Sequence, residues 1–209
     1  MLRNIAKELK HHAPFTFGGA IAGVIFAIVF KGISNEFAHS VFKILHPMHV
    51  VLSALVTASM YELHTKGPWK SKKGLFTLLI IGYIGSVGIA TLSDCVIPYI
   101  GEVFLKMPNR GLHIGFIEQW WIVNPLAIAG ILWAYWKPTT KFPHSGHVLL
   151  STWASLFHIL MAKAGVITFT EAFIIIPFLF IAVWAPCCVS DIVFPLLFVK
   201  EKSTNTSEH

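Results

Sequence analysis

Six apolar segments follow one another along the 209-residue chain and limit the folds open to it. They lie near residues 15–30, 48–61, 75–93, 114–136, 148–164 and 169–188. A helix of about 20 apolar residues crosses the hydrocarbon core of a bilayer, which is about 30 Å thick. The chain is 55% hydrophobic and 12% charged, with a mean hydropathy of +0.69, values outside the range of soluble globular domains. The sequence therefore predicts an all-α, polytopic integral membrane protein with six transmembrane helices.

Basic residues are distributed unevenly among the connections between these segments. If the N-terminus is cytoplasmic, eleven of the 16 lysines and arginines lie in inner segments and five in outer loops. This bias follows the positive-inside rule, so both termini are expected in the cytoplasm, with the chain in the cell (inner) membrane. The same sorting explains the net charge of +6 without a nucleic-acid surface, and the lipid bilayer is the expected partner.

The two ends of the chain are expected to lie outside the bilayer. Residues 1–12 form a charged, amphipathic stretch, as a short interfacial helix would, and run into the first span without a small-residue cleavage site. Residues 201–209 are polar and are expected to be a disordered cytoplasmic tail.

Two polar motifs each occur twice in the chain. Ser93-Asp94-Cys-Val-Ile-Pro is echoed by Ser190-Asp191-Ile-Val-Phe-Pro, and these motifs hold the only two aspartates. His46-Pro-Met-His-Val-Val-Leu-Ser is likewise echoed by His-Ser-Gly-His-Val-Leu-Leu-Ser at residues 144–151. The first histidine precedes the Ser-Asp pair by 47 positions in one copy and by 46 in the other. The matched spacing predicts one three-helix unit written twice.

An odd number of spans in each unit requires the second copy to be inverted relative to the first, as in many transporters. We expect residues 1–109 to form the first three-helix repeat and residues 110–200 the second, inverted one. A homodimer would enlarge the buried core of so small a protein.

The motifs suggest where helices begin and break. A helix that starts at His46 would hold Pro47 in its first turn, where a missing N–H costs nothing, and would place His46 and His49 on one face near the membrane surface. Apolar character continues from residue 75 to 105, too long for one membrane helix. We expect Pro98 to kink or end that helix just after Asp94.

The inverted arrangement collects histidines and an aspartate on each side of the membrane. On the outer side the expected metal ligands are His46, His49, Asp94 and His113; on the inner side they are His12, His144, His147 and Asp191, with His11 next to His12. Imidazole and carboxylate groups suit divalent zinc, iron, manganese or cobalt. Ser93 and Ser190 would orient the carboxylates. The two clusters are expected to be two separate metal-binding sites, one on each side of the membrane, or halves of one central site if the helices are strongly tilted.

Glu118 and the three cysteines of the chain lie in or beside the apolar segments. Glu118 is expected inside the fourth span, as a ligand or a proton carrier. Cys95, Cys187 and Cys188 carry no disulfide framework, and thiols in apolar surroundings are usually inert.

Three functions are compatible with this pattern. The favoured one is a transporter for a divalent transition-metal ion, coupled to protons because metal binding releases them. The alternatives are a di-haem b-type cytochrome subunit, with His49 and His64 on one span and His144 and His158 on another, and an intramembrane metal-dependent hydrolase. Whether the protein is an enzyme stays open at this point.

Overall fold

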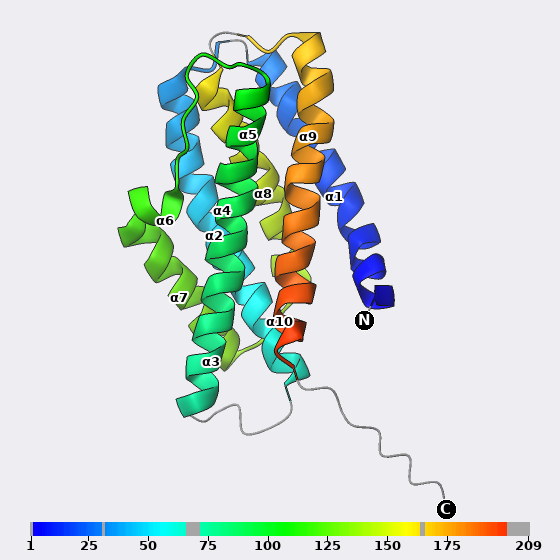
Figure 1. Cartoon of the computed structure of the whole chain (residues 1–209), viewed down its shortest axis with the longest axis vertical. Helices are drawn as coiled ribbons and strands as arrows, with labels where there is room; N and C mark the ends of the chain where they lie inside the picture. Colours follow the sequence, from blue (N-terminus) through cyan, green and yellow to red (C-terminus); the bar gives the residue numbers. More distant parts are fainter. Residues whose placement is uncertain (1, 31, 66–71, 164–165, 200–209) are drawn as a thin grey trace, which may run out of the picture.

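A computed structural model describes residues 2–30, 32–65, 72–163 and 166–199. Every regular element within these ranges is helical, and the long helices run roughly alongside one another in an elongated bundle (Figure 1). The expected all-α class is therefore confirmed. The predicted tail, residues 201–209, lies outside the described residues.

Helix α1, Leu2–Val29, is one continuous helix that contains Pro14. Residues 2–12, predicted as a short interfacial helix, are the first part of this helix. Gly23 lets α1 approach α8, Lys141–Ala162, because a Cβ at this position would lie 2.7 Å from Leu156 Cδ2. Small residues of this kind allow close helix contact.

Helix α2, Asn35–His64, begins eleven residues before His46, which corrects the expected start. Ser34 caps it by accepting a hydrogen bond from the Phe37 amide. The cap and the apolar periodicity after it favour a helix that continues through Pro47, which is buried inside the helix. At 1.5 Å per residue, His46 and His49 lie about 17 and 21 Å from the helix start, so they are deep in the bundle and not near its end.

Residues 72–104 form one long helical run interrupted by two π-helical turns. It consists of α3 (Lys72–Tyr83), η1 (Ile84–Gly88), α4 (Ile89–Thr91), η2 (Leu92–Val96) and α5 (Ile97–Phe104). We expected Pro98 to kink or end the helix. The helix instead continues past Pro98 to Phe104, because the π-helical turn η2 precedes the proline and accommodates the break in the hydrogen-bond ladder. Asp94 lies within that turn.

The second half of the chain departs from regular helices at its start. An irregular segment, residues 105–114, runs from α5 to the short helix α6, Gly115–Glu118, about halfway along the bundle (Figure 1). After Gln119 the chain continues as α7, Trp120–Trp136, so the predicted span 114–136 is broken near its beginning. Helix α8 is followed by α9 (Phe169–Cys188), η3 (Val189–Val193) and α10 (Phe194–Leu197).

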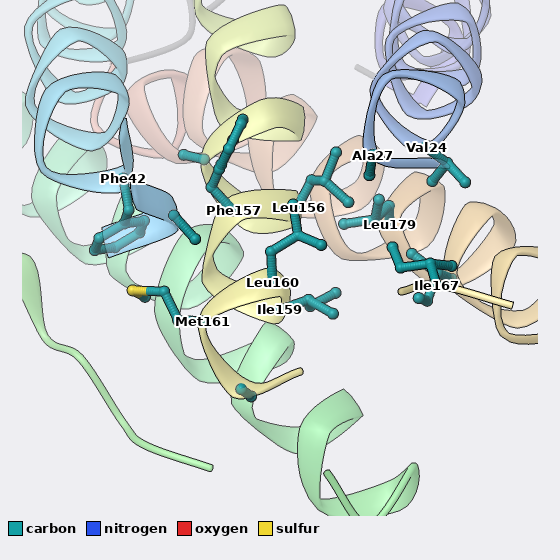
Figure 2. Close-up of a cluster of buried hydrophobic side chains, with 14 of the residues drawn as sticks. Val24, Ala27, Phe42, Leu156, Phe157, Ile159, Leu160, Met161, Ile167 and Leu179 are labelled. Carbon is teal, nitrogen blue, oxygen red and sulfur yellow. The ribbon is translucent and has the colours of Figure 1, made fainter. Parts of the chain in front are cut away.

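The apolar core lies where α8 packs between its neighbours. Figure 2 shows Phe157, Leu156 and Leu160 of α8 extending between Phe42 of α2 on one side and Leu179 of α9 on the other. All five side chains are buried. This cluster fixes the register of α2 against α8. These two helices carry most of the polar residues considered below.

Three of the described helices are long and apolar enough to cross a membrane: Asn35–His64, Lys73–Phe104 and Phe169–Cys187. Ala13–Val29 is apolar but shorter. The start of α1 and the end of α10 lie toward the same end of the bundle (Figure 1). Large apolar side chains such as Phe104, Phe169 and Phe173 are exposed, as expected of a surface that contacts lipid.

Candidate metal centre

Asp94 is the centre of a buried hydrogen-bond network. Its Oδ2 lies 2.9 Å from His46 Nδ1 and 2.7 Å from His49 Nδ1. Residues 46 and 49 share one face of α2, and the π-helical turn presents the carboxylate to that face. The structure thus brings together three of the residues that the repeated motifs predicted for one site.

The other carboxylate oxygen is bound by hydroxyl groups. Ser93 donates to Asp94 Oδ1 over 2.8 Å, and Ser151 of α8 donates to the same oxygen over 2.7 Å. Ser155, one turn further along α8, donates to the backbone carbonyl of Ser93 over 2.9 Å. Each oxygen therefore has two partners, which compensates the cost of burying a carboxylate.

This arrangement determines which imidazole nitrogens can bind a metal. An ionised carboxylate only accepts hydrogen bonds, so His46 and His49 each donate from Nδ1 and keep a lone pair on Nε2. Both Nε2 atoms are buried and have no hydrogen-bond partner among the described residues. Buried polar atoms in this condition are uncommon and are explained by an ion or a water molecule. A carboxylate that orients a metal-binding histidine is the usual outer shell of such sites.

A possible ligand group lies beside Asp94. His49, His147 of α8 and Cys187 of α9 are all buried, and each offers a ligand atom within 4.8 Å of the other two. The rings of His49 and His147 are stacked, with centroids 5.8 Å apart and an interplanar angle of 12°. Imidazole nitrogen and thiolate sulfur bind zinc at about 2.0–2.1 Å and about 2.3 Å, so this group could hold such an ion.

The contact between His49 and His147 joins the two halves of the chain. The repeated motifs predict these histidines on opposite sides of the membrane, or in one central site if the helices are strongly tilted. The stacked pair favours the central arrangement, because α2 and α8 place these side chains at the same depth.

Cys187 is a residue that the sequence analysis set aside as an inert thiol. Its neighbours are not purely apolar, because the packing of α9 brings it to two histidines. Nothing in the sequence around residues 186–188 indicates this contact. Cys95, the other buried cysteine that is described, does not belong to this group.

The second Ser-Asp motif also lies in a π-helical turn, η3. Ser190 donates to the Gly85 carbonyl over 2.8 Å, and its hydroxyl lies 3.1 Å from Thr57 Oγ1 and 3.4 Å from Ser53 Oγ. The predicted ligands His12, His144 and Asp191 have side chains outside the described part of the structure, so their expected roles stay predictions.

Hydroxyl contacts to the two motifs follow a reciprocal pattern. Ser53 and Thr57 of α2 contact the Ser190 turn of the second half, whereas Ser151 and Ser155 of α8 contact the Ser93 turn of the first half. The serine that closes each histidine motif thus reaches the Ser-Asp turn of the other half.

His113 and Glu118 lie beside each other. His113 was expected beside Asp94, but its ring lies against His39 and His158, with centroids 5.4 and 5.7 Å away. Glu118 ends α6 with its side chain 42% exposed, and both of its oxygens lie 3.3 Å from His113 Nδ1; its location inside a span stays a prediction. The break after α6 leaves this part of the chain at the surface of the bundle.

A second buried pair, Glu102 and His158, was missed as a pair. Glu102 Oε1 lies 2.7 Å from His158 Nδ1, and Oε2 accepts a hydrogen bond from the Gly111 amide. Both side chains are buried. An acidic residue in the apolar run after Pro98 was the available signal, since intramembrane acids are seldom left without partners.

Comparisons with family models, with curated proteins and with solved structures found no match to this chain. We therefore infer function from the geometry of the site.

Proposed function

We propose that this protein is a membrane transporter for a divalent transition-metal ion, which binds as substrate at the centre formed by His49, His147 and Cys187. The observation that carries this proposal is the group itself: three metal-type ligands, buried, on three different helices, with His49 held by Asp94. Two of these helices, α2 and α9, are long and apolar enough to cross a membrane. A transport site reached alternately from two sides requires ligands on separate helices at mid-depth.

The proposed architecture is six spans in two inverted repeats, with both termini on the cytoplasmic side of the inner membrane. Three observations support it: the Ser-Asp motifs both lie in π-helical turns, the hydroxyl contacts between the halves are reciprocal, and the chain starts and ends toward one end of the bundle. By this symmetry we expect Asp191 to act with His144 and His147 as Asp94 acts with its histidines.

The chemistry of the ligands favours coupling to protons. A metal binds the thiolate and neutral imidazole forms, so occupation of the centre releases the Cys187 proton. His46 contacts the same carboxylate oxygen as His49 and is a candidate acceptor for that proton. Zinc, iron, cobalt and manganese remain the candidate ions; thiolate and imidazole favour zinc, iron and cobalt over manganese.

The two alternatives fare differently. In a bis-histidine haem, the two imidazoles approach the iron from opposite faces, whereas His49 stacks on His147. That contact does not support the haem interpretation. A hydrolase keeps an observation in its favour, because three protein ligands leave a fourth position for water.

Metal flux into proteoliposomes tests the proposal. We expect wild-type protein to carry zinc or cobalt ions into vesicles and the Cys187→Ser variant to lose most of that flux. Cys95→Ser is the matched control, since this cysteine is also buried but lies outside the ligand group. Equal flux in the two variants would contradict the assigned centre. Metal bound tightly by wild type without any flux would contradict transport and favour the hydrolase.

A further inference from the structure

A small cavity lies at the end of the bundle where α2 begins. Its volume is about 270 Å³, and we call it the vestibule; it is lined by Asn35, Glu36, His39, Asn109, His113 and Met161. Asn35, Glu36 and Asn109 are exposed, so the cavity is reached from the surface. The residues around it come from α2, from the irregular segment 105–114 and from the end of α8.

His39 and His113 of the vestibule form a second possible ligand group with Glu118. Each of the three offers a ligand atom within 4.8 Å of the other two. Both oxygens of Glu118 lie 3.3 Å from Nδ1 of His113, so these atoms face the same space. Nε2 of His39 is buried and has no hydrogen-bond partner in the described structure.

Gly111 keeps space beside this group. A Cβ at residue 111 would lie 2.9 Å from His113 Nε2, so any larger residue would displace the His113 ring from this group. Two imidazoles and a carboxylate suit the same borderline divalent ions as the buried centre.

A row of imidazoles leads inward from the vestibule. His158, paired with Glu102, lies against His113 with ring centroids 5.7 Å apart. Phe42 then lies between the two regions: its ring contacts His158 edge-on and stacks on His46, in each case with centroids 5.3 Å apart. Beyond His46 come Asp94 and the buried centre.

We infer that His39, His113 and Glu118 form a second, exchangeable site for a divalent transition-metal ion, from which the buried centre is loaded past Phe42. The loading step rests on the proposed function, whereas binding at the vestibule does not. The vestibule ligands are partly exposed, with His113 34% exposed, so an ion there keeps water ligands and exchanges readily. The side chain of Phe42 must move before an ion passes from His158 to His46.

Titration of the detergent-purified full-length protein with Co²⁺ distinguishes the two sites. Cobalt bound to Cys187 gives a thiolate-to-metal charge-transfer band, and cobalt at the vestibule does not. We expect wild type to bind two equivalents, one with the band and one without. The His39→Gln/His113→Gln double variant should lose the equivalent without the band, keep the final amplitude of the band, and develop it more slowly.

The matched control is His64→Gln, which removes an exposed histidine of α2 that binds its own backbone. This variant should bind like wild type. A double variant that keeps both equivalents would overturn the vestibule site, and an unchanged rate of band formation would overturn loading through it. A wild type that shows only the equivalent without the band would overturn the buried centre and leave the vestibule site standing.

Discussion

The buried centre and the vestibule use similar ligands in opposite surroundings. Both combine two histidines with one further ligand. At the centre all three residues are buried and His49 is held by Asp94, whereas at the vestibule Glu118 is 42% exposed and itself contacts His113. The two groups therefore differ in burial and in the residues that hold the ligands, more than in ligand identity. We expect the buried centre to select an ion and the vestibule to collect it.

The two sites differ in what their ligand atoms contact when no metal is bound. At the centre, Nε2 of His49 is buried without a hydrogen-bond partner among the described residues, and a bound metal would supply that partner. At the vestibule, His113 and Glu118 are partly exposed, so water reaches these groups when no ion is present. We therefore expect tighter binding at the centre and faster exchange at the vestibule.

The largest contrast is expected when a carboxylate is replaced by the corresponding amide in each region. Asp94→Asn replaces an acceptor by an amide whose NH₂ must face either the two Nδ1–H groups or the two serine hydroxyls. Removing one partner of a buried charged network typically costs about 3–5 kcal/mol. Loss of an outer-shell ligand partner weakens metal binding about 10–100-fold. Glu118→Gln should change the free energy of unfolding by no more than about 0.5 kcal/mol, since its side chain is partly exposed.

Thermal unfolding in detergent, with and without zinc, measures both effects. Asp94→Asn should melt well below wild type and gain little from zinc, whereas Glu118→Gln should melt like wild type and keep most of the gain. Similar melting of the two variants would show that the Asp94 network does not hold the centre.

A smaller effect is expected at Gly115, which lies against the ring of His46. A Cβ at residue 115 would lie 2.3 Å from His46 Nε2, so Gly115→Ala must displace the His46 ring. Overpacking of this kind typically costs about 1–3 kcal/mol. Gly88→Ala is the control, because an added Cβ there meets nothing within 4 Å. A stable Gly115→Ala variant with unchanged zinc affinity would mean that His46 has no part in supporting the centre.

The motifs of the sequence predicted the pairing of His46 and His49 with Asp94 because it depends on local rules. Residues three apart share a helix face, and the same spacing recurs in both halves of the chain. The depth of these residues was not predictable from Pro47, since a proline inside a helix costs one hydrogen bond that packing can offset.

Cys187 and the Glu102–His158 pair could not be predicted from local rules. Cys187 meets His147 only through the register of α9 against α8, which the apolar core fixes. Glu102 meets His158 because the helix continues past Pro98 for another turn and a half. His113 was misplaced because the helix predicted over residues 114–136 is broken after Glu118.

The most direct test of the central claim is the X-ray absorption spectrum of zinc bound to the purified full-length protein at one equivalent. The account predicts a first shell with one sulfur at about 2.3 Å and nitrogen ligands at about 2.0–2.1 Å. The sulfur contribution should disappear in Cys187→Ser and persist in Cys95→Ser. A wild-type shell of nitrogen and oxygen alone, or no bound zinc, would contradict a centre built from His49, His147 and Cys187.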